Sequence, residues 1–166
     1  MSHLYVLTLE VVPLEVSKVY DELPSHITLM SRFLSDLDAR ELGNGIRPLF
    51  EAASPLRLTF GATVELGPKR VTAHMISSRN EQRLHESTRV LLEKMEVVSQ
   101  YPQFTGANHK PHVTQREGAV FPPHSRLVSS AAYLIEIIDG NRVVRERFRL
   151  GPAGKALQNV TGGLLQ

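Results

Sequence analysis

A short motif suited to a β-strand occurs twice in this 166-residue chain. His26-Ile27-Thr28 and His112-Val113-Thr114 each place an apolar residue between a histidine and a threonine, and a proline stands shortly before each. Successive side chains of a strand point to opposite faces, so the imidazole and the hydroxyl of each motif share one face, about 6.6 Å apart. The apolar middle residue then faces the core. Two such strands predict a sheet protein with a loose internal repeat.

Hydrophobic periodicity around the two motifs predicts an α+β fold with mainly antiparallel pairing. Gly67-Pro68-Lys69 and Asp139-Gly140-Asn141 separate alternating apolar segments and mark hairpin turns. The expected strands cover residues 4–12, 25–33, 56–66, 70–76, 111–116, 127–138 and 142–150.

Two other segments have helical spacing. Ser35, with an acid three residues later, is typical of a helix N-cap, and apolar residues at helical spacing continue to Ala53. Gly43-Asn44-Gly45 interrupts this helix and is expected to split it. Ser78 and Glu81 form a capping-box signal, which predicts a second helix over residues 79–99.

The chain contains no cysteine. This excludes a disulfide framework, a thiolate nucleophile and a zinc site with sulfur ligands. The N-terminus lacks a signal-peptide pattern, and no apolar run approaches the ~20 residues of a membrane span, so a cytoplasmic protein without a membrane partner is expected. Residues 1–150 are expected to form one domain, followed by a flexible tail over residues 151–166.

The formal net charge of +2 is too small for a protein that wraps duplex DNA. Arginines crowd residues 142–149, and for Arg145, Arg147 and Arg149, which share one strand face, a solvated face is favoured over a nucleic-acid track. The histidines outside the two motifs lack the spacing of metal ligands, so neither a metal nor a cofactor is expected.

If the two motif strands lie side by side, His26, Thr28, His112 and Thr114 face one groove. A neutral imidazole can take a proton from an attacking water or ribose hydroxyl, while a protonated imidazole gives one to the leaving oxygen. Threonine hydroxyls can hold the non-bridging oxygens of a phosphate as charge develops. These groups suit phosphodiester cleavage without a metal ion, and either histidine can act as the base.

The segments Ser25–Leu29 and Lys110–Thr114 resemble the paired motifs of the two-histidine (2H) phosphoesterase superfamily. The resemblance in element order extends from about residue 4 to residue 150. It implies a bilobal, pseudo-symmetric α+β fold, with two mainly antiparallel sheets, helices on the outside and the active groove between the lobes. Members include RNA 2′,5′-ligase-like enzymes, 2′,3′-cyclic nucleotide phosphodiesterases and phage enzymes that destroy cyclic oligonucleotide signals.

We therefore expect a metal-independent phosphodiesterase that hydrolyses a 2′,3′-cyclic phosphate, or a 2′,5′ or 3′,5′ linkage, in a nucleotide or short RNA. If the motif strands continue, Arg32 and Arg116 lie on the same strand faces as His26 and His112, so each is a candidate to bind a second phosphate. The candidates to stack on a base are Tyr5, Tyr101, Phe104, Phe121 and Tyr133, and Tyr5 is the one assigned to the site. Two alternatives stay open. One is the hydrolysis of cyclic di- or trinucleotide signals, and the other is a non-catalytic module that binds nucleotides or RNA.

Overall fold

The computed structural model describes residues 1–116 and 119–151. Its strands are β1 (His3–Glu10), β2 (Val19–Tyr20), β3 (His26–Ser35), β4 (Leu56–Leu66), β5 (Val71–Ser77), β6 (Val98–Ser99), β7 (His112–Thr114), β8 (Arg126–Ser129), β9 (Ala131–Ile138) and β10 (Asn141–Arg149). Its α-helices are α1 (Ala39–Ala52) and α2 (Arg79–Lys94), and two 3₁₀ turns, η1 (Pro102–Phe104) and η2 (Gly106–Asn108), lie between β6 and β7.

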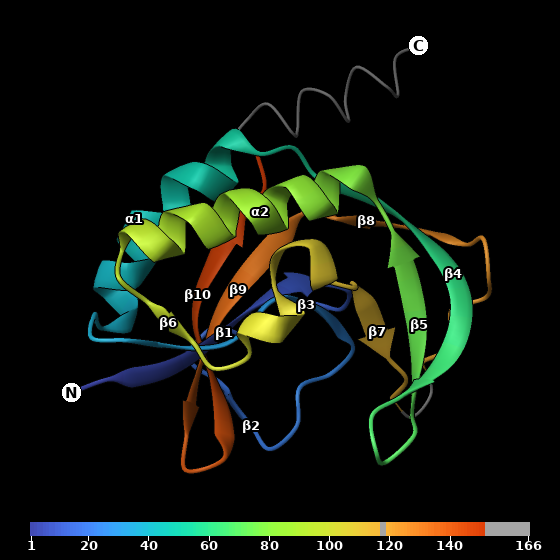
Figure 1. Ribbon diagram of the computed structural model, residues 1–166, viewed down its shortest axis with the longest axis horizontal. Coiled ribbons are helices and arrows are strands. Elements are labelled where there is room, and N and C mark those ends of the chain that lie inside the picture. The colour runs from blue at the N-terminus through green and yellow to red at the C-terminus, as the bar shows by residue number, and fades with distance from the viewer. Residues whose placement is uncertain (117–118, 152–166) are drawn as a thin grey trace.

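The strands pair in the order β2-β10-β9-β1-β3-β7-β5-β4-β8. The short strand β6 lies off this path and pairs with the C-terminal end of β3, at Phe33 and Leu34. Every pairing is antiparallel, so the predicted α+β class is confirmed. The two expected sheets are joined into one curved sheet, because Ile27 of β3 pairs with Val113 of β7 (Figure 1). One half of the sheet contains β1, β3, β9 and β10, and the other contains β4, β5, β7 and β8.

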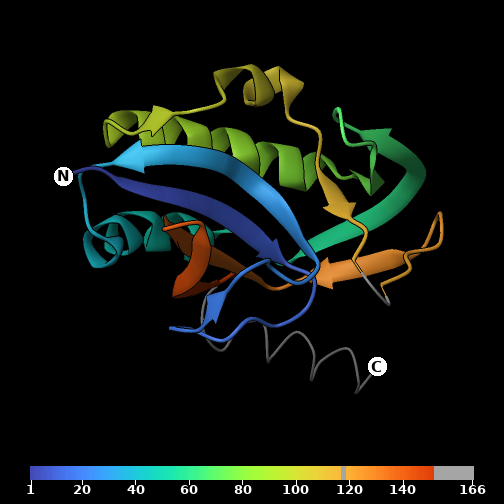
Figure 2. The same cartoon turned by 90° about the horizontal axis from the view of Figure 1, so that it is seen from below.

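Both helices lie side by side along one face of this sheet (Figures 1 and 2). α1 packs on β9 and β10, while α2 packs on β3 and β4. The main core lies between these layers and includes Leu29, Phe50, Phe60 and Phe148, all of them buried. Neither helix of the described residues has the length and apolar character that a membrane span requires.

The first helix begins later than its sequence signal. Ser35 is still part of β3, and the N-cap is Asp38, whose side chain accepts a hydrogen bond from the backbone N–H of Glu41 at 2.9 Å. The Glu41 carboxylate accepts in return from the Asp38 N–H at 3.2 Å, which completes a capping box. The prediction that Ser35 caps this helix is therefore wrong.

The predicted split of this helix at Gly43-Asn44-Gly45 is also wrong, because α1 runs without a break from Ala39 to Ala52. The glycines allow close packing there. A Cβ atom on Gly43 would lie 3.0 Å from Cγ of Glu146 on β10, and one on Gly45 would clash with the Met95 side chain. The missing side chains thus let α1 approach its neighbours closely.

The second helix starts where predicted, with the Ser78 hydroxyl accepting from the Glu81 N–H at 3.1 Å. It ends at Lys94 rather than at residue 99. Glu96 has a positive φ of 60°, and the chain then turns back so that Val98 and Ser99 pair with β3 as β6. Residues 98 and 99, predicted to end the helix, instead form a short strand along β3.

The two predicted hairpins, β4–β5 and β9–β10, are confirmed. Asp139 and Gly140 have φ angles of 50° and 80°, as a two-residue turn between antiparallel strands requires. The single strand predicted over 127–138 is instead two strands. β8 pairs with β4 in one half of the sheet and β9 pairs with β1 in the other, so the chain crosses between the halves at Ser130. Gly151, the first residue of the predicted tail, is buried and donates its N–H to the Phe50 carbonyl at 3.1 Å, while residues 152–166 lie outside the described residues.

We expect Ile27→Ala to lower the free energy of unfolding by about 2–5 kcal/mol, because Ile27 is fully buried where the two halves of the sheet meet. Val128→Ala on β8, where the side chain is 58% exposed, is the matched control and should change it by less than about 0.5 kcal/mol. Urea denaturation of both variants tests this. Similar losses in the two variants would contradict the central place of Ile27 in the fold.

Candidate active site

The two His-x-Thr motifs lie next to each other in the sheet. Because β3 and β7 are antiparallel and Ile27 pairs with Val113, His26 lies beside Thr114 and Thr28 beside His112. Ile27 and Val113 are both fully buried, so the four polar side chains project from the opposite face. In such a pair, Cβ atoms directly across lie about 5 Å apart and diagonal neighbours about 7–8 Å apart. The predicted adjacency of the motif strands is confirmed.

The two imidazole rings are held in the same way. Nδ1 of His26 lies 2.8 Å from the carbonyl oxygen of Pro24, and Nδ1 of His112 lies 2.9 Å from that of Lys110. A carbonyl only accepts, so each Nδ1 carries the proton and donates it. Nε2 of each ring is then the atom that can exchange protons with a substrate. Each motif therefore orients its histidine through the carbonyl two residues earlier.

Two cavities flank the motifs. The first, which we call the cationic compartment, has a volume of about 270 Å³, and its lining includes three arginines and one carboxylate. Its lining residues are Val6, Glu22, Leu23, His26, Thr28, Ser31, Arg32, Tyr101, Arg116, Ile137 and Arg142.

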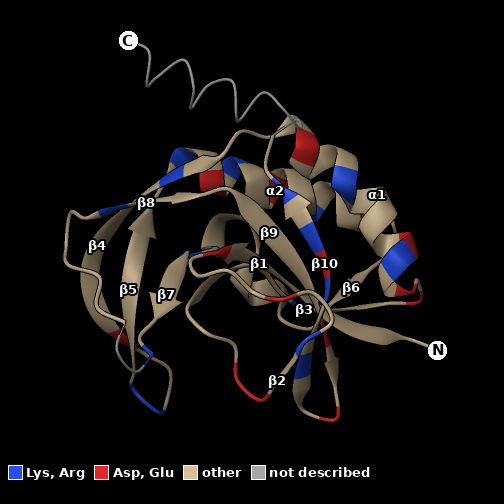
Figure 3. Ribbon diagram, turned by 180° about the vertical axis from the view of Figure 1, so that it is seen from behind, with Lys and Arg blue, Asp and Glu red and all other residues tan. Residues whose placement is uncertain are grey.

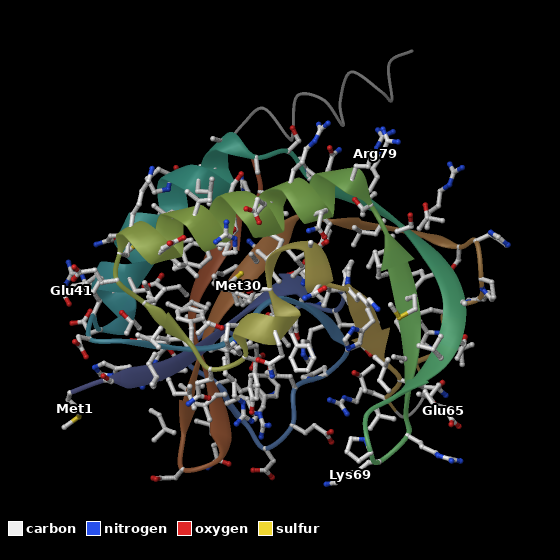
Figure 4. The ribbon with its side chains drawn as sticks, viewed as in Figure 1. Met1, Met30, Glu41, Glu65, Lys69 and Arg79 are labelled. Carbon is white, nitrogen blue, oxygen red and sulfur yellow. The ribbon has the colours of Figure 1, made fainter. Side chains whose placement is uncertain are left out.

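The second cavity, the apolar compartment, has a volume of about 840 Å³. His112 and Thr114 lie on its floor, and its walls come from the β4–β5 hairpin and the η1–η2 loop. Figure 4 shows Glu65 and Lys69 near the end of this hairpin. The apolar wall residues are Leu66, Val71, Ala73, Met75 and Phe104. Thr28, Ser31 and Arg116 line both compartments, so the two cavities meet beside the motifs.

Arg32 lies on the same face of the sheet as His26, although β3 is irregular. Strict alternation would place residues 26, 28, 30 and 32 on one face. Two register shifts against β1 add extra residues to β3, and Met30 consequently turns into the core beneath α2 (Figure 4). Ser31 and Arg32 then both line the compartment. The two shifts together restore the original alternation, so Arg32 keeps the face predicted from the sequence and shares a cavity with His26.

Arg116 lies two residues beyond the end of β7, where the two compartments meet. One guanidinium nitrogen lies 2.5 Å from the Glu22 carboxylate, which holds the side chain across the groove. Its Nε is buried, with no hydrogen-bond partner among the described residues. Arg116 therefore has a donor that none of the described residues uses.

The environment of His26 favours a neutral ring. Burial lowers the pKa of His26 below its ordinary value of 6.5, and the nearby positive charges of Arg116, His112 and Arg142 lower it further. The hydrogen bond to the Pro24 carbonyl acts in the opposite direction but is outweighed. At neutral pH His26 is thus unprotonated at Nε2 and able to accept a proton.

Tyr5 does not belong to this site, contrary to the sequence prediction. Its side chain is fully buried, and its hydroxyl donates to the Leu37 carbonyl at 3.0 Å. Its ring packs 5.9 Å from those of His3 and Phe33. A substrate cannot stack on it. Tyr101 and Phe104 are the aromatic residues that line the two compartments.

Charged residues of both signs are interspersed on the helices and along β10 (Figure 3). Arg145 is paired with Glu136 at 2.6 Å and Arg147 with Glu10 at 3.7 Å, so these side chains neutralise acids of neighbouring strands. Arg142, at the start of the same strand, instead lines the cationic compartment. The sequence marked Arg142 as one residue of an arginine-rich segment and gave no signal for its position at the groove.

A buried polar cluster supports the loop before β7. The Glu81 carboxylate, fully buried, lies 2.5 Å from Nε2 of His109, which lines the apolar compartment. The His109 ring stacks on that of His85 with centroids 3.8 Å apart. His85 donates from Nδ1 to the Leu29 carbonyl and accepts the Gly106 N–H, so it ties this loop to β3. The sequence revealed Glu81 only as a capping residue.

Comparisons with known proteins agree with this architecture. The sequence matches the family model of the 2′-5′ RNA ligase superfamily over residues 10–127. No sequence in a search of curated proteins matches the chain significantly.

Several solved structures share the fold. One, described as a phosphoesterase, is 13% identical and has a TM-score of 0.58, with 91% of this chain and 99% of that chain covered. A protein of Thermus thermophilus is 21% identical, with a TM-score of 0.53 and coverage of 92% and 100%. E. coli LigT complexed with 3′-AMP is 12% identical, with a TM-score of 0.53 and coverage of 91% and 99%.

The family match covers both His-x-Thr motifs and most of the strands that position them. The structural neighbours extend the same fold over nearly the whole chain. This protein therefore belongs to the 2′-5′ RNA ligase superfamily, a group of 2H phosphoesterases.

Proposed function

We propose that this protein is a metal-independent phosphodiesterase that hydrolyses a nucleotide phosphodiester with His26 and His112 as its acid–base pair. The observation that carries the proposal is the antiparallel pairing of Ile27 with Val113, which directs both histidines and both threonines into one groove. Three arginines line the adjoining compartment, so the local charge attracts a phosphate and opposes a divalent cation.

In hydrolysis, the oxygen of a water molecule attacks phosphorus, and the bond from phosphorus to the leaving oxygen breaks. Nε2 of neutral His26 accepts the proton released by the water, and protonated His112 donates its Nε2 proton to the leaving oxygen. The lowered pKa of His26 supports its role as the base. With a ribose 2′-hydroxyl in place of water, the same groups would cleave RNA to a cyclic phosphate.

The hydroxyls of Thr28 and Thr114 are placed to donate to the non-bridging oxygens of the phosphate between the histidines. Arg116, whose buried Nε has no partner within the described parts of the chain, adds a positive charge beside them. Together these groups would stabilise the negative charge that grows on the phosphate in the transition state.

A nucleotide is the substrate class that the groove suits best. The apolar compartment, with Val71, Met75 and Phe104 in its walls, has the volume and the lining for a nucleobase. Structures of the E. coli neighbour have been solved with 3′-AMP, NADP+ and ATP, which supports the same class here. We therefore expect turnover of 2′,3′-cyclic nucleotides or of 2′,5′- or 3′,5′-linked oligonucleotides.

Loss of either motif histidine should lower kcat/KM by about 10²–10⁴-fold, because each ring supplies one proton transfer. The variants His26→Ala and His112→Ala should be assayed with EDTA on 2′,3′-cyclic nucleotides, 2′,5′-linked oligoadenylate and cyclic di- and trinucleotides. His124→Asn is the matched control, since His124 lies in an exposed turn with a φ of 67°. It should retain wild-type turnover.

Saturable nucleotide binding without turnover by the wild-type protein would identify a binding module and contradict the proposal. So would full activity in either histidine variant. Turnover of cyclic di- or trinucleotides alone would keep the mechanism and reassign the substrate.

The pH dependence of kcat/KM should have a low-pH limb with its midpoint below 6.5. His26 must be neutral to act as base, and its pKa in the folded protein is lowered, so activity persists to more acidic pH than an ordinary histidine allows. Arg116→Gln removes a positive charge beside His26 and should move this midpoint toward 6.5, whereas Arg57→Gln, on the exposed face of β4, should not move it. A wild-type midpoint at or above 6.5 would contradict the assignment of His26 as the base.

A further inference from the structure

The cationic compartment has more positive charge than one scissile phosphate requires. Arg32, Arg116 and Arg142 line it, and Glu22, which pairs with Arg116, is the one carboxylate among the lining residues that the structure describes. The three arginines come from different parts of the chain, namely β3, the segment after β7 and the start of β10. Gathering three guanidinium groups in one cavity is unfavourable unless an anion offsets their repulsion.

Arg142 is held in place by backbone groups. One of its terminal nitrogens donates to the carbonyl oxygens of Asp21 and Gly140, each at 2.7 Å. These carbonyls tie the β9–β10 turn to the segment after β2 and fix the guanidinium at the wall of the compartment. A carbonyl does not neutralise a cation, so Arg142 keeps its positive charge at the lining of the cavity. The effect of Arg142 on the pKa of His26 agrees with this position.

The compartment extends away from the point where the scissile phosphate would lie. That phosphate belongs between the two motifs, beside Thr28, Ser31 and Arg116, which are common to both cavities. From there the cationic compartment continues to Ile137 of β9 and Arg142 of β10, in the half of the sheet opposite the apolar compartment. Arg142 thus lies on the far side of His26 from the predicted base-binding walls.

We infer that the cationic compartment binds a second phosphate group of the substrate, one that is not cleaved, with Arg142 and Arg32 as its main ligands and Arg116 shared between the two phosphates. This inference rests on the proposed function and specifies its substrate class. The preferred substrate is a nucleotide phosphodiester with a further phosphate, such as a 5′-phosphorylated 2′,3′-cyclic nucleotide or a phosphorylated oligonucleotide. Guanidinium groups suit this task because they donate two parallel hydrogen bonds to phosphate oxygens.

Calorimetric binding of product-like ligands tests the inference without any need for turnover. The probes are the 2′- and 3′-monophosphates of adenosine and the corresponding 2′,5′- and 3′,5′-bisphosphates, at pH 8, where a phosphate monoester is a dianion. Wild-type protein should bind a bisphosphate at least about tenfold more tightly than its monophosphate. This preference should fall with rising salt, since it arises from charge.

Arg142→Gln should reduce the ratio of the two affinities to about one to three. Arg32→Gln is a second variant with the same expected result, and it alters none of the backbone contacts that Arg142 makes. Arg145→Gln is the matched control, because Arg145 lies on the same strand as Arg142 but pairs with Glu136 outside the compartment. It should keep the wild-type preference. Thermal unfolding of each variant shows whether it is folded.

Equal affinities of wild-type protein for the two kinds of ligand would overturn the inference, and so would absence of binding by both at millimolar concentration. A preference that survives in both folded variants, Arg142→Gln and Arg32→Gln, would also overturn it. These results are separate from the test of catalysis. A protein that turns over unphosphorylated cyclic nucleotides without favouring bisphosphates would retain the proposed function and lose only the second phosphate site.

Discussion

The pairing of Ile27 with Val113 is the contact on which the site depends. It joins the two halves of the sheet, and it buries one apolar side chain from each motif against the same core. Antiparallel geometry then leaves the flanking polar side chains together on the opposite face. The same contact thus contributes to stability and brings the histidines together.

The near symmetry of the two motifs is broken by what surrounds them. His26 lies next to a compartment lined with arginines, and His112 lies on the floor of an apolar one. This difference distinguishes the two rings, because burial and positive charge lower the pKa of His26 and favour its neutral form. It also gives the groove two unlike ends, one suited to a phosphate and the other to a nucleobase. A symmetric pair of strands can therefore handle an asymmetric substrate.

Features set by neighbouring residues were predictable from the sequence. The His-x-Thr strands, the Ser78 cap and the Asp139-Gly140 turn all follow from local backbone preferences, and each was located correctly. Features set by distant pairing were not.

Tyr5 was assigned to the site although it lies in the core, and Arg142 was overlooked although it reaches the groove from β10. The register shifts in β3 and the close packing of α1 on β10 at Gly43 likewise depend on partners far along the chain.

The most direct test of the central claim is a crystal structure of the protein with inorganic phosphate bound. We expect a single phosphate ion with one oxygen within hydrogen-bond distance of Nε2 of His26, another within reach of Nε2 of His112, and the hydroxyls of Thr28 and Thr114 on the remaining oxygens. A phosphate that contacts only one of the two imidazoles, or rings whose Nε2 atoms point away from each other, would contradict the claim that both histidines act on one phosphorus atom.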